Sequence, residues 1–412
     1  MKVAFLSDDF PPLSFGGAGI STYELAKGMK DAGHEVFVIT TCRNKEEVGN
    51  MKYHDLEIYK IMSNYSGKWR WYVSLYNFPV VRQVENLLKK IRPDIVHINN
   101  IHYYLSYHCL KISKKYAGAV VFTARDVMSF NYAKLDTERY LKNLDCRTTW
   151  FDHIRQTKKR WNPLRNILIK NYLKYADKIF AVSFALKKAL EQNGINKVEV
   201  IHTGADFTQA DPSREKIENF INKFGLKDKK VIFFGGRLSE AKGGRKVLEA
   251  MTEVVKKFPN AVLLVAANEG LYMQKIKNDA EMMSILKNIV FTGWIGREEM
   301  KIAYAVSQVV LVPSICLDSF PRIVLESMAS GKPVIGTCYG GSPEIIEDGL
   351  TGYIVNPMFP KEISEKILYL FENAKKMEEF GKSGRERVRN YFNLKNKVNE
   401  YAEAYKKSLK NG

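Results

Sequence analysis

Short apolar runs recur along the chain and are separated by longer segments with helical periodicity. Buried strands that alternate with helices in this way are typical of parallel sheets in α/β domains. In the first half of the chain the predicted strands are Lys2–Ser7, Glu35–Thr40, Ile58–Met62, Asp94–Ile98, Ala119–Thr123, Lys178–Val182 and Val198–Ile201. In the second half they are Lys230–Phe234, Ala261–Ala267, Ile289–Phe291, Val309–Val312, Val334–Gly336 and a short strand within Gly349–Val355.

This pattern divides the chain into two doubly wound α/β domains whose strand ends face a cleft. We expect an N-terminal Rossmann-like domain over residues 1–205 and a C-terminal Rossmann-like domain over residues 206–385. Residues 386–412 are expected to form a C-terminal helix that packs back toward the first domain. Residues 129–174 interrupt the alternation, and we interpret this basic and aromatic segment as a helical insertion at the mouth of the first domain.

Composition narrows the class of protein without identifying it. The chain has 412 residues, of which 45% are hydrophobic, so two sizeable cores can form. No apolar run approaches the roughly 20 residues that a membrane span needs, and the N-terminus reads as a short strand and not as a signal peptide. The five cysteines form no Cys-x-x-Cys pair, which supports neither a disulfide framework nor a structural zinc site. We therefore expect a cytoplasmic protein.

Charge is distributed unevenly between the two halves. The net charge is +19, and residues 1–200 hold 32 Lys and Arg against 19 Asp and Glu. A basic excess attracts anionic membranes, nucleic acid or phosphorylated ligands, and charge alone does not choose among them. Aromatic side chains among the basic residues of the insertion suit a membrane interface, although ordinary half-buried helix faces give the same pattern.

The stretch Pro313–Ile335 holds the strongest candidate site. A buried strand is followed by a loop and by a helix that is expected to run from about Pro321 to Ala329, with Ser319 or Phe320 as N-cap. The first helical turn would present N–H groups to an anion, and the helix dipole would add to the attraction. These donors belong to Arg322, Ile323 and Val324.

Two carboxylates flank this predicted anion site, and two cations are expected to face it. Asp318 lies before the helix and Glu326 on it, so a nucleotide diphosphate with hydroxyls on both sides would fit. Arg237 and Lys242 follow the strand Lys230–Phe234 and could neutralise a leaving diphosphate. The alternative is a capped surface helix with an Arg322–Glu326 ion pair. The sequence holds no Asp-x-Asp, so no metal-dependent diphosphate site of that kind is predicted.

The first domain offers further candidates near its strand ends. Gly16 and Gly17 lie in a glycine loop between a strand and a helix that is expected to begin at Ser21, so the backbone could approach a phosphate or sugar closely, or simply turn there. His97, Arg125 and Asp126 are placed where ligands of open parallel sheets bind, and we consider them acceptor or sugar contacts. His97 could equally be a buried histidine bonded to the backbone.

Taken in order, these segments resemble the retaining glycosyltransferases of family 4, which have the GT-B fold of two Rossmann-like domains. The resemblance covers nearly the whole chain. The matching segments are Gly16-Gly17, Gly33-His34, Ala176–Ser183, Thr203–Asp206, Gly236–Gly243, Pro313–Ile335 and Gly340–Val355.

The resemblance implies a role for each matching residue. Arg237 and Lys242 match the pair that binds the donor phosphates, and Asp318 and Glu326 match the two carboxylates that contact the donor sugar and the ribose. Gly17 matches the loop glycine that approaches phosphate or sugar. Among these residues Asp318, Arg237 and Lys242 are the candidate catalytic set. We add Trp294, which follows the strand Ile289–Phe291, to the predicted donor-binding residues.

Three departures from the family pattern bear on specificity. Asp318 stands where glutamate is usual, and Pro321 replaces a usual glycine. Arg125 occupies the position of a usual histidine, where it could bind an acidic sugar or an acceptor phosphate, or pair structurally with Asp126.

The resemblance implies an enzyme that moves a sugar from a UDP-, GDP- or ADP-sugar to an acceptor hydroxyl with retained configuration, without a metal or other cofactor. The acceptor could be a glycan, a lipid-linked sugar precursor or a small molecule, and the enzyme could contact the inner face of an anionic membrane. Nucleic acid is not an expected partner. The alternatives are a sugar-nucleotide 2-epimerase of the same fold, or a catalytically weakened protein that binds a nucleotide sugar.

Overall fold

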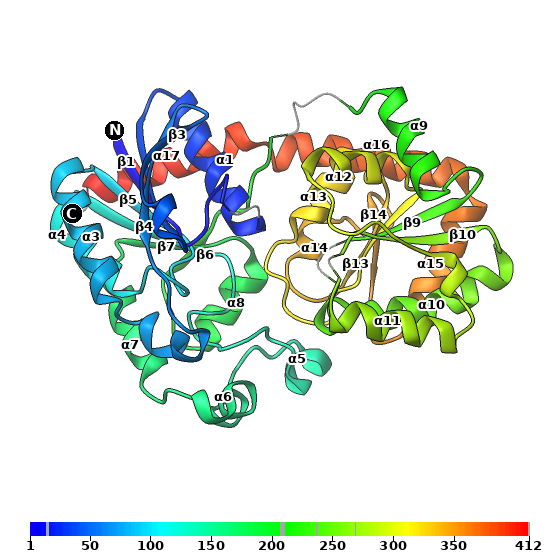
Figure 1. The fold of residues 1–412 in the computed structure, drawn as a ribbon, viewed down its shortest axis with the longest axis horizontal. Coiled ribbons are helices and arrows are strands. Elements are labelled where there is room, and N and C mark those ends of the chain that lie inside the picture. The colour runs from blue at the N-terminus through cyan, green and yellow to red at the C-terminus, as the bar shows by residue number, and fades with distance from the viewer. Residues whose placement is uncertain (14–15, 207–210, 236–237, 268, 411–412) are drawn as a thin grey trace. The chain divides into compact units, whose positions relative to one another are not determined.

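The computed structural model describes residues 1–412 except 14–15, 207–210, 236–237, 268 and 411–412, which are grey in Figure 1. The chain separates into two compact units, and each is described by itself. The first unit comprises Met1–Asp206 together with Asn393–Gly412, and the second comprises Phe207–Phe392. The last segment of the chain therefore belongs to the unit that the N-terminus begins.

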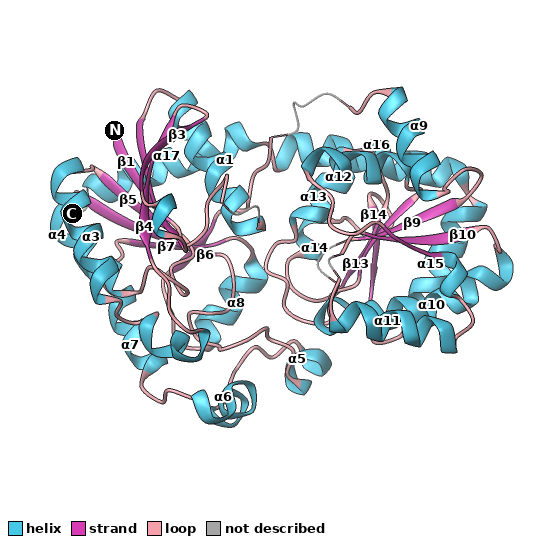
Figure 2. Cartoon of the chain, in the orientation of Figure 1, coloured by secondary structure: helices cyan, strands magenta, loops and turns pink. Residues whose placement is uncertain are grey.

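The first unit is built on an eight-stranded sheet in the order β3-β4-β2-β1-β5-β6-β7-β8. Figure 2 draws the strands in magenta and the helices around them in cyan. Neighbouring strands pair in parallel, except that β3 runs antiparallel to β4. All strands but β3 therefore end at the same edge. The strands are β1 Lys2–Leu6, β2 Glu35–Cys42, β3 Gly49–Tyr53, β4 Leu56–Met62, β5 Ile95–Ile98, β6 Ala119–Ala124, β7 Lys178–Ala181 and β8 Val198–Val200.

Helices α1 and α17 contribute to the core on one face of this sheet. Phe5, Phe180, Val398 and Tyr405 meet in a single buried cluster, which joins the first strand to the last helix. The helices of the unit are α1 Gly17–Asp31, α2 Arg70–Val73, α3 Phe78–Ile91, α4 His108–Tyr116, α5 Glu138–Asn143, α6 Trp150–Thr157, α7 Arg165–Leu173, α8 Phe184–Gln192 and α17 Leu394–Lys410. Short 3-10 turns form at η1 Lys45–Glu47, η2 Gly67–Trp69 and η3 Lys158–Arg160.

The second unit has a six-stranded parallel sheet in the order β11-β10-β9-β12-β13-β14. Its strands are β9 Lys230–Phe234, β10 Ala261–Val265, β11 Ile289–Phe291, β12 Val309–Val312, β13 Val334–Thr337 and β14 Gly352–Val355. Its helices are α9 Arg214–Phe224, α10 Gly244–Lys257, α11 Leu271–Met282, α12 Arg297–Val306, α13 Arg322–Ala329, α14 Ser342–Ile345, α15 Pro360–Glu372 and α16 Ala374–Tyr391, with 3-10 turns η4 Glu240–Lys242 and η5 Leu286–Asn288. Both units are thus doubly wound α/β domains, as the alternation of runs predicts.

The predicted C-terminal helix over residues 386–412 is two helices in the structure. Helix α16 ends at Tyr391 within the second unit, and α17 begins at Leu394 within the first. The break falls at Asn393, whose side-chain oxygen accepts a hydrogen bond from the Lys395 amide at 2.8 Å and so starts a new helix.

Two other helix starts differ from the prediction. Helix α1 begins at Gly17, so Ser21 lies inside it and donates its hydroxyl back to the Gly17 carbonyl at 2.9 Å. Helix α4 begins at His108, whereas the sequence pattern predicts a helix over Tyr104–Tyr116. The preceding backbone is withdrawn from the helix because it donates hydrogen bonds to Asp8, as described below.

Candidate functional site

The loop from β12 to α13 forms the centre of the second unit's candidate site. Pro321 is the N-cap of α13, with φ −69° and ψ 109°, so the helix starts one residue later than predicted. The Val324 amide donates to the Pro321 carbonyl at 3.0 Å. Of the three N–H groups that were expected to bind an anion, that of Val324 is therefore already engaged within the helix.

Lys242 and Asp318 come together as the sequence predicts for one site. The Lys242 ammonium donates to Asp318 Oδ2, and the Ser314 hydroxyl donates to the same oxygen at 3.1 Å. Both charged side chains are 18% exposed. Side chains with this exposure are partly shielded from water but can still be reached by a ligand. Charges attract a ligand more strongly there than on an open surface, because the surrounding dielectric constant is lower.

Backbone contacts hold the two loops of this pair against each other. The Ile315 amide donates to the Ala241 carbonyl at 2.9 Å. Gly243 has φ +77°, and a Cβ there would lie 2.2 Å from the Pro313 carbonyl oxygen. The close approach of the two loops therefore requires glycine at this position.

The Asp318 backbone is fixed from a third element, the turn after β13. The Gly341 amide donates to the Asp318 carbonyl at 2.8 Å. Gly340 has φ +70°, and a Cβ there would lie 2.2 Å from the same carbonyl oxygen. Sequence reasoning assigned no role to this turn or to Ser314, and the glycine pair was the signal that could have found the turn.

Glu326 on α13 is held by two partners. Its Oε1 lies 3.3 Å from Arg322 Nη2, and its Oε2 accepts the hydroxyl of Tyr304 at 2.8 Å. Tyr304 comes from α12 and is almost fully buried, and burial together with the Glu326 charge raises its pKa well above the usual value. The ion pair of the alternative interpretation is thus present, alongside the convergence of Lys242 on Asp318.

Two predicted donor-binding positions, Arg237 and Trp294, are not among the residues that the structure brings together here. Arg237, with its neighbour Gly236, lies outside the described residues. Trp294 follows β11 and is 69% exposed. Strand β11 is three places from β12 in the sheet, so the end of β11, which Trp294 follows, lies on the order of 14 Å from the end of β12 along the same edge.

In the first unit, Asp8 organises the edge where the parallel strands end. Its carboxylate accepts the amides of Tyr103, Tyr104 and Leu105 at 2.7, 2.8 and 2.7 Å. Burial raises the pKa of Asp8 to about 7, although the three amide donors act in the opposite direction. Gly16 caps α1 nearby in sequence, and Gly17 begins that helix. Asp8 was not predicted as a site residue.

His97 is interior and does not reach the edge where acceptor contacts were expected. It is fully buried, and its ring nitrogens bond to the Tyr405 hydroxyl at 2.6 Å and the Thr123 hydroxyl at 2.8 Å. Burial is the main cause that lowers its pKa well below the usual value. The alternative, a buried histidine, is the one that the structure supports, with side-chain partners in place of the backbone.

Arg125 and Asp126 face different partners. Arg125 Nε donates to Asn99 Oδ1 at 2.9 Å, and Asp126 Oδ2 lies 3.5 Å from His102 Nε2. Both residues are partly exposed and follow β6, so they remain at the strand-end edge. Among the described residues there is no group of three or more His, Cys, Asp or Glu side chains arranged to hold a metal ion.

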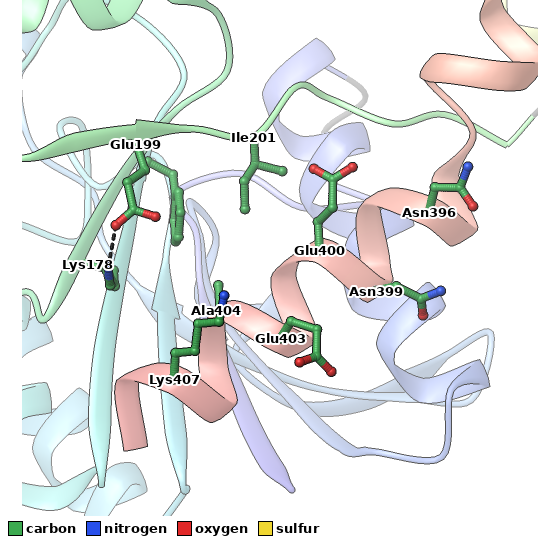
Figure 3. Close-up of a pocket in the computed structure, with 10 residues that line it drawn as sticks. Lys178, Glu199, Ile201, Asn396, Asn399, Glu400, Glu403, Ala404 and Lys407 are labelled. Carbon is green, nitrogen blue, oxygen red and sulfur yellow. Dashed lines mark hydrogen bonds and ion pairs between the residues drawn. The ribbon is translucent and has the colours of Figure 1, made fainter. Parts of the chain in front are cut away.

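A hollow of about 670 Å³ lies elsewhere in the first unit, between β8 and α17 (Figure 3). Phe180, Ile201 and Ala404 contribute apolar surface to it, and Lys178 pairs with Glu199 at its side. It contains none of the predicted site residues. In the described part of the chain, no helix is long and apolar enough to cross a membrane.

Comparisons with known proteins agree with this architecture. Residues 15–209 match the family described as Glycosyltransferase Family 4, and residues 216–387 match Glycosyl transferases group 1. The chain is similar to the uncharacterized glycosyltransferase MJ1607 of Methanocaldococcus jannaschii, at 27% identity over 404 residues, covering 91% of this chain and 93% of that protein. It is 25% identical to spore coat protein SA of Bacillus subtilis over 224 residues, covering 52% of this chain and only 59% of that protein.

A solved structure shows the same fold over both chains. Anabaena Alr3699/HepE in complex with UDP aligns with a TM-score of 0.74 at 18% identity, covering 99% of this chain and 100% of that chain. The fold and the paired family matches define a glycosyltransferase of the GT-B type. Within that class the chain belongs to family 4, the group 1 glycosyl transferases.

Proposed function

We propose that this glycosyltransferase moves a sugar from a nucleotide-diphosphate sugar to an acceptor hydroxyl with retention of configuration, and that the second unit binds the donor. The observation that carries the proposal is the convergence of Lys242 and Ser314 on Asp318 beside the start of α13. A cation from one segment of the chain, with a carboxylate and a helix N-terminus from another, suits a ligand that carries both phosphate and hydroxyl groups.

Each group at this centre has a distinct role in the proposal. Lys242, with Arg237, stabilises the negative charge that develops on the leaving diphosphate. Asp318 contacts the donor sugar, and Glu326, fixed by Tyr304, contacts the ribose. The incoming hydroxyl attacks from the face that the diphosphate leaves. The cations supply the charge that a metal ion supplies in other diphosphate sites, so no metal is required.

The nucleotide base and the sugar can be found by a binding screen. HepE was solved with UDP, which places UDP-sugars first in the test, followed by GDP- and ADP-sugars. The melting temperature should rise when the right donor is added, because a ligand at 100 times its Kd adds roughly 2.7 kcal/mol to the free energy of unfolding. No stabilisation by any of the three classes would contradict the proposal.

A product assay then separates transfer from the other activity considered for this fold. A transferase releases the nucleoside diphosphate and forms a new glycosidic bond only when an acceptor is present. A 2-epimerase would convert the nucleotide sugar without an acceptor, and a binding protein would leave it unchanged. Formation of an acceptor-linked sugar with the donor's anomeric configuration is the outcome that the proposal requires.

We further propose a lipid-linked or otherwise membrane-borne acceptor, which a peripheral contact of the first unit would reach. The insertion exposes apolar side chains: Trp150 is 60%, Phe151 69% and Ile167 58% accessible. Lys158 and Lys159, on η3, are exposed cations of the same insertion. Each cation near an anionic leaflet contributes about 1 kcal/mol, and the contribution falls with salt.

Co-sedimentation with vesicles tests this contact. The protein should pellet with phosphatidylglycerol vesicles at low salt, less at high salt, and little with neutral phosphatidylcholine vesicles. Replacement of Lys158, Lys159 and Arg160 by Ser should reduce the bound fraction. Equal behaviour on neutral and anionic vesicles, or no change in the variant, would contradict membrane docking through the insertion.

A further inference from the structure

A cluster of aromatic and cationic side chains occupies the strand-end edge of the first unit, and the proposed donor chemistry does not use it. It consists of Arg70 and Trp71 on α2, Tyr103 after β5, and Arg165 on α7. Helix α2 follows β4 and Tyr103 follows β5, and these two strands are separated by β2 and β1 in the parallel sheet. Ligands of open α/β sheets bind at this edge.

Arg70 has partners that stack against it but do not neutralise it. Its guanidinium carbon lies 3.4 Å from the centre of the Tyr103 ring and 4.4 Å from that of Trp71. Its Nη2 meets the sulfur of Met128 at 3.5 Å, and its Nε is buried without a hydrogen-bond partner in the described part of the chain. A guanidinium has five N–H donors, so Arg70 retains capacity for an acceptor.

A second guanidinium adds to the positive potential. Arg165 is fully buried and lies 5.1 Å from Trp71 and 4.6 Å from Tyr132, measured to the ring centres. Its polar partners are uncharged oxygens: the Asn131 and Met128 carbonyls and the side chain of Asn166. Two guanidinium charges are thus held together by rings and neutral groups, an arrangement that a nearby anion would stabilise.

Of the other titratable groups around the cluster, Asp126 offsets part of this charge, because its carboxylate favours the charged form of Arg165. Asp126 accepts a hydrogen bond from the Met128 amide and lies 3.5 Å from His102 Nε2, and Asp8 is held by its three amide donors. Burial lowers the pKa of His102 to about 4, with both arginines acting in the same direction, so this imidazole is neutral. His153, near Arg165, has its pKa lowered to about 4 by burial as well.

Solvent reaches the cluster through its rim. Tyr103 is 38% exposed and Trp69, the residue before Arg70, is 61% exposed. Arg70 itself is half-buried. An anion could therefore approach the guanidinium edge while the adjoining ring faces contact an apolar or sugar surface, which aromatic side chains favour.

We infer that Arg70, with Tyr103 and Trp71 around it, forms a site for a phosphate group carried by the acceptor. This inference rests on the proposed transfer to an acceptor held by the first unit, and it names the acceptor's chemistry as anionic. The phosphate could be a sugar phosphate or the phosphodiester of a lipid. Both present the same oxygens to a guanidinium.

Met128 offers a local reporter, since its sulfur contacts Arg70. In protein labelled with 13C-methyl methionine, its signal is assigned by Met128→Leu. We expect inorganic phosphate, glucose 6-phosphate and dihexanoyl phosphatidylglycerol to shift the Met128 signal, and unphosphorylated glucose to leave it in place. Tighter binding of glucose 6-phosphate would identify a sugar phosphate as the natural group, and tighter binding of the lipid would identify a phosphodiester headgroup.

Arg70→Gln should weaken the phosphate titration at least tenfold, because it removes a charge-assisted hydrogen bond of about 1.5 kcal/mol or more. Arg43→Gln is the matched control. Arg43 lies at the same edge and stacks on Tyr104 at 3.0 Å, but it lies 3.6 Å from Asp9 and so has a carboxylate partner. Its loss should change the affinity by less than about twofold. An unmoved Met128 signal, or equal affinity in wild type and Arg70→Gln, would overturn the inference.

The two proposals can fail separately. UDP affinity, measured on the same samples, reports the second unit and should be equal in wild type and Arg70→Gln. Lys242→Ala should leave the Met128 titration unchanged, since Lys242 belongs to the second unit and Met128 to the first. A Met128 response in a protein that binds no nucleotide sugar would support the anion site and contradict the proposed transferase.

Discussion

Asp8 shows what one buried carboxyl does at the edge of the first sheet. It holds the backbone of Tyr103, Tyr104 and Leu105 with three short hydrogen bonds, although the sequence pattern predicts a helix from Tyr104 onward. The loop that results presents Tyr103 to Arg70. A single side chain just after β1 therefore decides the conformation of a segment about a hundred residues further along the chain.

Asp8→Asn should lower the melting temperature by several degrees. An amide offers one acceptor oxygen, so one buried N–H loses its partner at a cost of about 1–3 kcal/mol. The pKa of Asp8 is raised from 3.8 to about 7, so its contribution to stability is complete below pH 4 and is lost as the pH rises through 7. The melting temperature of the variant should fall less between pH 5 and pH 8 than that of wild type.

Asp31→Asn is the control for this experiment, because Asp31 is also an aspartate of the first unit and its side chain is 61% exposed. It should change the melting temperature by about a degree or less at either pH. The same pH response in wild type and Asp8→Asn would contradict the assignment of a titrating carboxyl at this position.

In the proposal Tyr304 positions Glu326, and its hydroxyl can be removed without altering the side chains that are proposed to act in sugar transfer. Tyr304→Phe keeps the ring, which packs edge-on against Phe233, and removes only the hydroxyl that donates to Glu326. We expect KM for the nucleotide sugar to rise about fivefold, equivalent to about 1 kcal/mol, with little change in kcat. Tyr369→Phe, on an exposed tyrosine of α15, should change neither. A fall in kcat at constant KM would contradict a ribose-side role.

At the scale of elements, the site depends on loops that the turn after β13 and the η4 turn hold in place. Gly340→Ala and Gly349→Ala form a matched pair, because both glycines have positive φ, +70° and +75°. A Cβ at Gly340 would meet the Asp318 carbonyl at 2.2 Å, whereas at Gly349 it would meet nothing within 4 Å. Both substitutions carry the same backbone strain, of about 1 kcal/mol or more.

Gly340→Ala should therefore reduce donor affinity at least tenfold by displacing Asp318, while Gly349→Ala should lower stability with donor affinity unchanged. Calorimetric titration with the nucleotide sugar and thermal unfolding of both variants provide the comparison. Equal donor affinity in the two variants would show that the close approach to Asp318 does not shape the site.

Helices and strands were predictable where their buried positions produce a clear pattern of apolar residues, and less so where that pattern is missing. Apolar runs predicted the parallel strands of both sheets, whereas β3, with the polar sequence Gly49–Tyr53 at a sheet edge, gives no such run. The convergence of Lys242 and Asp318 followed from their places in the loops after two strands of the second domain. The partner of His97 did not, because Tyr405 lies 308 residues away and no local pattern encodes that distance.

At the scale of the whole molecule, the account requires that transfer proceed without a divalent ion. Activity should survive EDTA, because Lys242, Arg237 and the start of α13 are proposed to meet the charge of the diphosphate. An assay of nucleoside diphosphate release, with and without chelator, checks this expectation. Complete loss of activity that magnesium or manganese restores would contradict it.

The most direct test of the central claim is calorimetric titration of the donor nucleoside diphosphate into wild type, Lys242→Ala and Arg237→Ala. The account predicts that each substitution weakens binding by about 10- to 100-fold, because each removes a charge-assisted contact of about 1.5–3 kcal/mol. Lys246→Ala, four residues beyond Lys242 and paired with Glu249, should bind as wild type does. Unchanged affinity in both Lys242→Ala and Arg237→Ala would contradict the proposed phosphate site.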